Sequence, residues 1–199
     1  LSKVARWLTV AKVNTHKFFN RDSFKDTMGH AWNLMHEPEI REDSDYLFVI
    51  QCYCLGDWNK IMQHGLWIFR GLVVMIEEYD GKGIPGSVTL ECISVWAQIH
   101  DITNLYRSQP KGDQLAQRIG QAKSIEMNLA RVYEGNCVRV RAKIEVSNPL
   151  TRFTRLNVNG KESIFLLVKY EKLGYLCLWH PRPHNMEECG DGFHGTEKR

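Results

Sequence analysis

The stretch VRVRAKIEV at residues 138–146 alternates apolar and charged side chains without a break. Successive side chains of a β-strand point to opposite faces, so a strict period of two predicts a strand with one buried face and one polar face. The polar face carries Arg139, Arg141 and Lys143. We therefore expect a sheet that is packed on one side and presents a basic row to water on the other.

The residues around this strand predict a small α+β unit in the second half of the chain. The other elements expected there are strands at 95–100, 125–130, 155–158 and 163–170 and a short helix near 114–122. Asn159-Gly160 joins the last two strands and is typical of a type I′ hairpin. We interpret this half as a βαβββ variant of the first half and as a weak internal repeat.

The first half predicts a ferredoxin-like, RRM-like βαββαβ unit, which makes the fold class α+β. Asn20 is a candidate N-cap. The apolar residues that follow it at helical spacing are Phe24, Met28, Ala31, Trp32 and Met35. A second helix is expected from Leu55 until Gly65 ends it. The strands expected in this half are 6–12, 39–42, 46–52 and 72–79.

These patterns divide the chain into four parts. Residues 1–80 form the ferredoxin-like domain, 81–93 a linker, 94–173 a basic α+β domain and 174–199 a small tail. The linker contains a G-x-G-x-x-G match at 81–86. A phosphate-binding loop of this type opens into a helix, whereas Pro85 and the β-branched residues after it favour an extended connection.

Charge is distributed unevenly along the chain. The 26 basic and 23 acidic residues give a net charge of +3, but residues 107–172 hold 13 of the basic and only 6 of the acidic ones. A local positive field of this kind favours phosphate polymers as partners. The sequence has no apolar run long enough to span a membrane and no secretory leader, so we expect a nuclear or cytoplasmic protein that is not secreted.

The tail contains a candidate zinc site. Cys177, His180, His184 and Cys189 offer two thiolates and two imidazoles, a complete tetrahedral set for Zn²⁺ at short spacing. The alternative is a histidine-rich tail whose residues merely lie close in the sequence.

Several stretches resemble a known family. They are KYEKL at 169–173 leading into Cys177, VRVRAKIEV at 138–146, Pro149-Leu150, GLWIF at 65–69 and VWAQIH at 95–100. Together they resemble plant retrotransposon-associated, LINE-like proteins, in which a domain of unknown function precedes a CCHC zinc knuckle. The resemblance implies a degenerate knuckle here, because His180 replaces the second Cys and the inner spacing is one residue short.

The resemblance also implies binding of single-stranded nucleic acid, with Trp179 of the knuckle stacking on a base. The residues themselves suggest that Arg139, Arg141 and Lys143 hold phosphates with help from Arg152 and Arg155. The alternative function is a protein-interaction or self-association module. We expect no enzymatic activity, since the sequence lacks a G-x-S-x-G, a P-loop or an H-E-x-x-H motif.

Overall fold

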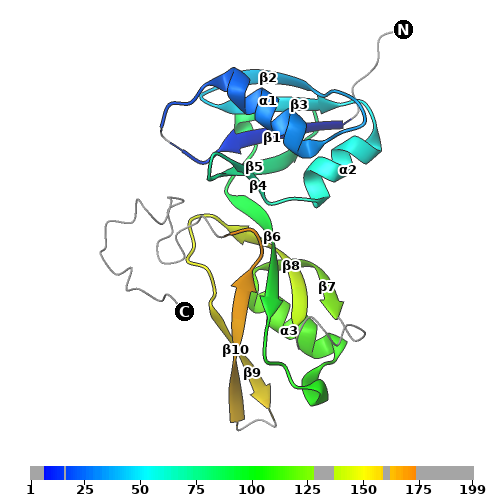
Figure 1. Ribbon diagram of the computed structural model, residues 1–199, viewed down its shortest axis with the longest axis vertical. Helices are drawn as coiled ribbons and strands as arrows, with labels where there is room; N and C mark the ends of the chain where they lie inside the picture. The colour runs from blue at the N-terminus through cyan, green and yellow to red at the C-terminus, as the bar shows by residue number, and fades with distance from the viewer. Residues whose placement is uncertain (1–6, 16, 128–136, 159–161, 174–199) are drawn as a thin grey trace.

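The computed structural model describes residues 7–15, 17–127, 137–158 and 162–173. Within these ranges the fold is α+β and contains two five-stranded antiparallel sheets that follow one another along the chain (Figure 1). The elements are β1 (Trp7–Val13), α1 (Arg21–Trp32), β2 (Glu39–Ser44), β3 (Leu47–Cys52), α2 (Leu55–Gln63), β4 (Trp67–Phe69), β5 (Leu72–Tyr79), η1 (Pro85–Ser87), β6 (Cys92–Ile99), η2 (Asn104–Tyr106), α3 (Gln109–Ile119), β7 (Gln121–Met127), β8 (Val138–Glu145), β9 (Phe153–Val158) and β10 (Glu162–Tyr170). No helix among the described residues is both long and apolar enough to cross a bilayer.

The first sheet has the strand order β2-β3-β1-β5-β4. Without β4 this is the ferredoxin-like arrangement, with α1 and α2 packed on one face, as the sequence predicts. The short edge strand β4 was not predicted. It pairs with β5 through a two-residue turn in which Arg70 and Gly71 both have positive φ, the conformation of a type I′ hairpin.

Helix α1 begins where the sequence predicts and ends earlier. The Asn20 side chain accepts a hydrogen bond from the Ser23 N–H at 3.0 Å, and Phe24 and Trp32 are fully buried. The helix ends at Trp32 because Asn33 adopts a left-handed conformation with φ of 45°. The prediction that Met35 continues the buried face is therefore wrong, and its side chain is 84% exposed.

The second sheet has the order β7-β8-β6-β10-β9, which repeats that of the first sheet position by position. Residues 146–152 stand where α2 stands in the first unit, so this unit is βαββββ. It contains the five strands predicted by their ranges, one more than the label βαβββ counts. Helix α3 begins at Gln109, earlier than predicted, because a proline fits the first helical turn. Strand β7 likewise begins at Gln121, directly after Gly120.

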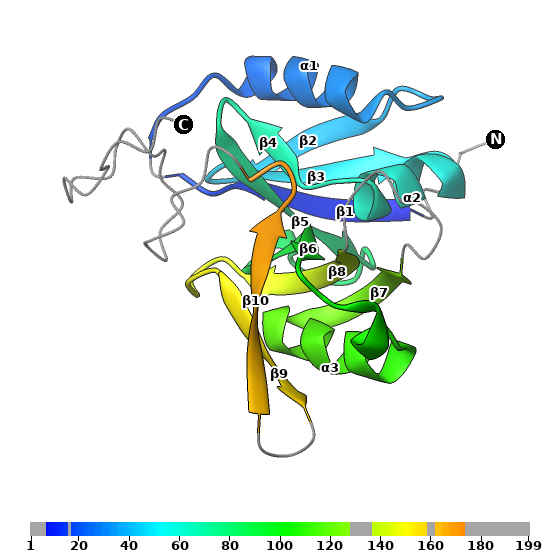
Figure 2. The same cartoon turned by 60° about the horizontal axis from the view of Figure 1, so that its bottom comes forward.

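The two sheets pack against each other (Figure 2). Val73 and Met75 of β5 point away from α1 and α2 and belong to the apolar core of the second unit. The connecting segment lies against the same side of the first sheet, since η1 contacts β2 and β3. The Tyr79 hydroxyl also donates to the Gly83 carbonyl at 2.6 Å. Much of the first sheet's face opposite its helices is thus covered.

The G-x-G-x-x-G match at 81–86 lies in this connecting segment. It leads into the short 3-10 turn η1 (Pro85–Ser87) and then into β6. The described chain therefore has no α-helix whose N-terminus this loop would place against a phosphate, in agreement with its interpretation as a connection.

Candidate nucleic-acid interface

Strand β8 has the two faces that its sequence predicts. Val138, Val140 and Ala142 are buried in the core beneath α3. Arg139, Arg141 and Lys143 lie on the opposite face and are only partly exposed. That face is turned toward the first unit. It is therefore only partly exposed to solvent, although its side chains are polar.

Arg139 is held by two carboxylates. Its Nε and Nη2 donate to the two carboxylate oxygens of Glu171 at 2.7 and 2.8 Å, and its Nη1 donates to Glu126 at 2.8 Å. The hydrogen bonds with Glu171 raise the pKa of Arg139, and the same contact lowers the pKa of Glu171. The guanidinium carbon also lies 3.8 Å from the centre of the Trp96 ring.

The other two cations of the row contact the first unit. Lys143 Nζ lies 2.5 Å from a carboxylate oxygen of Glu77 in β5. Arg141 Nη2 donates to the Met62 carbonyl near the end of α2 at 3.2 Å, and burial lowers the pKa of this arginine. The prediction that Arg139, Arg141 and Lys143 form a row facing water is therefore wrong, because the first unit and three carboxylates cover it.

We expect Arg139→Ala to act on stability. The variant loses charged hydrogen bonds and a cation–π contact in a partly screened site, so the free energy of unfolding should fall by about 2 kcal/mol. Urea denaturation measures this change. Arg155→Ala in the same sheet is the matched control and should stay within about 0.5 kcal/mol of wild type. A variant as stable as the control would contradict the structural role of Arg139.

Exposed aromatic residues lie on the β9–β10 hairpin instead. Phe153 is 61% and Phe165 is 71% exposed. In the antiparallel register Phe165 is directly opposite Arg155, and Lys169 of β10 is opposite Gln98 of β6. By strand alternation all four lie on the sheet face away from α3, and we call Phe153, Arg155, Phe165 and Lys169 the aromatic hairpin face.

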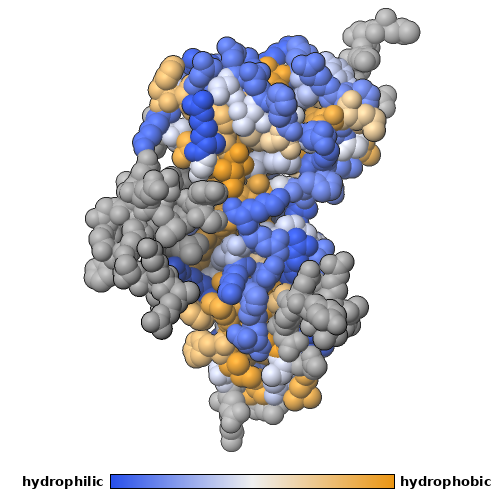
Figure 3. Space-filling view, in the orientation of Figure 1, coloured by the Kyte–Doolittle hydropathy of each residue, from blue (hydrophilic) through white to orange (hydrophobic). Residues whose placement is uncertain are grey.

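The hairpin projects from the end of the molecule that is remote from the first unit (Figure 1). Figure 3 shows apolar and hydrophilic side chains intermingled over this lower end. On the other side of the hairpin Leu156, Val158 and Leu166 are buried in the core, which fixes the orientation of both strands. The buried residues thus direct the aromatic hairpin face away from the core, where it is open to solvent.

Cations lie on this face and along its edge strand β9. Among the described residues no carboxylate forms an ion pair with Arg155 or Lys169. From α3, Arg118 donates to the Arg155 carbonyl at 2.7 Å and Lys111 donates to the Asn157 carbonyl at 3.3 Å. Carbonyl partners leave the charge of both side chains in place, so the edge strand β9 has a positive border.

The predicted site residues therefore have different positions. Arg155 is exposed on the aromatic hairpin face, and Arg152 is partly buried just before β9. Trp179 and the candidate zinc ligands Cys177, His180, His184 and Cys189 lie outside the described residues. The sequence-based predictions do not include Phe153 and Phe165. Their signal was the alternation in FTRLNV and SIFLLVK, which places each ring on the same strand face as a cation.

The fold and this site define an α+β protein in which a ferredoxin-like unit is followed by a second unit of the same strand order. The second unit carries exposed aromatic and basic side chains on its outer hairpin. No protein-family model matches the sequence, and no curated protein matches it. The chain is structurally similar to the three N-terminal RNA-binding domains of the yeast splicing factor Prp24. The TM-score is 0.30 at 8% identity, over 69% of this chain and 54% of that one. This chain thus spans about half the length of that chain, and a likeness of this size says nothing about what this chain binds.

Proposed function

We propose that this protein binds single-stranded nucleic acid through the aromatic hairpin face. The observation that carries the proposal is the pair of exposed rings, Phe153 and Phe165, on one sheet face with Arg155 and Lys169. Unpaired bases stack on exposed aromatic rings, and cations beside the rings hold the phosphates between the bases.

The central strands of the second sheet do not serve as the platform in this arrangement. Trp96 is the aromatic residue of β6 on that face, and the Arg139 guanidinium covers its ring. Stacking of bases there would have to displace a cation that two carboxylates hold. The outer hairpin needs no such displacement, which is why we assign binding to it.

Two further parts of the proposal rest on the sequence and its resemblance to a known family. One is an origin in a plant LINE-like retrotransposon. The other is a zinc-knuckle-like tail at 174–199 that adds a second contact to the nucleic acid. A non-enzymatic role fits both parts. Removing the tail residues tests the second contact separately from the hairpin.

A salt titration tests the function. We expect the full chain to bind a labelled oligo(U) or oligo(dT) strand with an affinity that falls linearly on a log–log plot against salt. Arg155→Ala and Lys169→Ala should each make the slope shallower by about 0.7, the value for one phosphate contact on a single strand. Fluorescence anisotropy at four or more salt concentrations measures the slope.

The control is Lys25→Ala in the first unit, where the lysine lies 3.8 Å from Asp22 on α1. Its slope should equal that of wild type. If neither hairpin variant changes the slope, the hairpin is not the binding surface. A different outcome would support the alternative function. If the chain does not bind the oligonucleotide, and light scattering shows self-association that the hairpin variants abolish, the protein is a protein-interaction module.

A further inference from the structure

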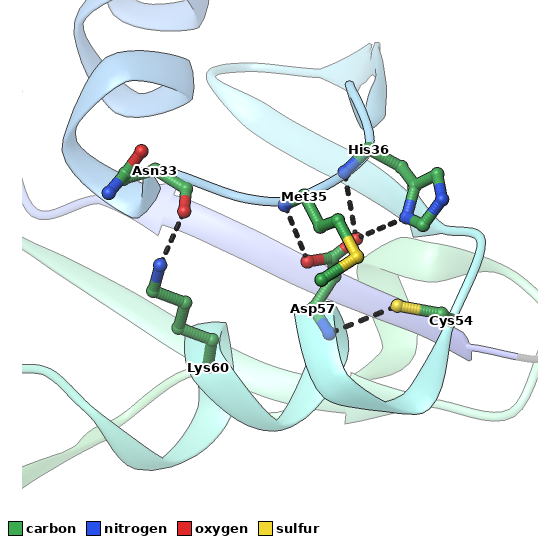
Figure 4. A network of polar contacts seen from close by, with 6 residues as sticks. All are labelled: Asn33, Met35, His36, Cys54, Asp57 and Lys60. Carbon is green, nitrogen blue, oxygen red and sulfur yellow. Dashed lines mark hydrogen bonds and ion pairs between the residues drawn. The ribbon is translucent and has the colours of Figure 1, made fainter.

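A second group of reactive side chains lies in the first unit, between the end of α1 and the start of α2 (Figure 4). After Asn33 the chain passes across the first turn of α2. Asp57, in that turn, is only 4% exposed. Cys54 is the N-cap residue of α2, and its Sγ accepts a hydrogen bond from the Asp57 N–H at 3.4 Å. Lys60 of α2 donates to the Asn33 carbonyl, and this hydrogen bond connects the chain segment after α1 to α2.

The Asp57 carboxylate is oriented by donors from this segment. One oxygen accepts the Met35 N–H at 2.8 Å. The other accepts the His36 N–H at 3.1 Å and lies 3.0 Å from His36 Nδ1. Burial alone would raise the pKa of Asp57, but these hydrogen bonds outweigh it and hold the pKa at about 2. The group is a carboxylate at neutral pH.

Three ligand atoms of different kinds converge here. The imidazole nitrogen of His36, the Sγ of Cys54 and a carboxylate oxygen of Asp57 all lie within 4.8 Å of one another. In a tetrahedral zinc site, bonds of about 2.0–2.3 Å place ligand atoms roughly 3.3–3.8 Å apart. Small side-chain rotations would therefore bring all three to bonding distance.

We propose that His36, Cys54 and Asp57 form a zinc site. Thiolate and imidazole ligands select zinc over the hard ions Mg²⁺ and Ca²⁺, which prefer oxygen. The backbone N–H groups of Met35 and His36 already orient the carboxylate, as outer-shell donors do in zinc proteins. The His36 side chain is about half exposed, so the ion has a path from solvent and a fourth position is left for water.

Binding changes the hydrogen bonding of the group in a defined way. The zinc ion takes the place of the hydrogen bond from His36 Nδ1–H to the Asp57 carboxylate. Nδ1 therefore loses its proton, and the bound neutral imidazole carries its one proton on Nε2, the exchange taking place through solvent. The Cys54 thiol releases its proton to solvent, because the thiolate is the ligand. The N–H bonds from Met35 and His36 to the carboxylate persist. This site is independent of the proposed nucleic-acid function and of the tail.

Cobalt substitution tests the site once the tail's thiols are removed. The starting protein is the full chain with Cys177→Ser and Cys189→Ser, kept reduced. Addition of Co²⁺ should produce thiolate-to-cobalt charge-transfer absorption and one tightly held ion per chain. Adding Cys54→Ser should abolish the absorption. Serine is itself a preferred N-cap, so α2 should stay intact in that variant.

Two more variants provide a control thiol and remove a second ligand. Cys92→Ser removes a free thiol on β6 and should leave the absorption unchanged. His36→Asn should weaken cobalt binding on the order of 100-fold, the share of one ligand in a four-ligand site. The proposal is wrong if the starting protein is folded by circular dichroism and gives no thiolate absorption, or if the absorption survives Cys54→Ser. In both cases the three residues would serve only to hold the segment on α2.

Discussion

Replacing Phe153 and Phe165 together with alanine should weaken binding of a single-stranded oligonucleotide by roughly 30-fold or more. Stacking of one base on an aromatic ring contributes about 1–3 kcal/mol, so two rings contribute about 2 kcal/mol at the lower end. Both rings are exposed and pack little in the folded chain. The thermal midpoint of the double variant should therefore stay close to that of wild type, which separates lost binding from lost folding.

The matched control is Phe18→Ala. Phe18 is also exposed, but it lies in the first unit beside Tyr46, at 6.4 Å between ring centres. Affinity should not change in this variant. A second pair of substitutions, Phe153→Tyr with Phe165→Tyr, keeps both rings and should retain most of the affinity. If the alanine double variant binds as wild type does while remaining folded, bases do not stack on this hairpin.

A comparison of the Phe153→Ala, Phe165→Ala double variant with Lys169→Ala separates the contribution of base stacking from that of phosphate contact. Loss of the rings should lower affinity equally at all salt concentrations, because stacking releases no counterions. Loss of the cation should lower it mostly at low salt. In a plot of log affinity against log salt concentration, the line of the ring variant should run parallel to that of wild type, and the line of Lys169→Ala should be shallower. This result would assign stacking to the rings and phosphate contact to the lysine.

Local patterns predicted the helices and strands well where the sequence itself contains the signal. Asn20 begins α1 as its capping side chain indicates, and the alternation of β8 gives the correct buried face. The errors lie where a single residue determines the end or the beginning of a helix. The left-handed Asn33 ends α1 before Met35, and Pro110 permits α3 to begin earlier than a count of apolar residues suggests.

The candidate site was harder to predict because period-two alternation identifies a polar face without saying what covers it. Arg139 and Lys143 alternate with apolar residues just as exposed cations do. Their partners Glu171 and Glu77 lie 32 and 66 residues away in the sequence. Only the packing of one sheet on the other brings Glu77 to Lys143. Phe153 and Phe165 were missed for other reasons. The strand predicted at 155–158 leaves Phe153 outside it, and an aromatic residue inside a strand, such as Phe165, is expected to be buried.

The second large effect concerns stability. Phe24→Ala should lower the free energy of unfolding by about 3–5 kcal/mol. The Phe24 ring is fully buried, stacks on Phe48 at 4.2 Å between ring centres and meets Phe69 edge-on at 5.3 Å. Its removal leaves a cavity between α1 and the first sheet that the stacked rings cannot fill. Phe18→Ala in the same unit removes an exposed ring and is the control, with an expected change within about 0.5 kcal/mol.

The same variant tests whether the two units unfold together. Val73 and Met75 of the first sheet belong to the second unit's core, and the contact between Lys143 and Glu77 joins the two sheets. If the first unit unfolds, the second loses both. We therefore expect a single denaturation transition, and faster amide hydrogen exchange in β8 as well as in α1 when Phe24 is replaced. Two separate transitions, with exchange in β8 unchanged by Phe24→Ala, would mean that the second unit is stable without the first. The face carrying Arg139 and Arg141 would then be accessible whenever the first unit opened.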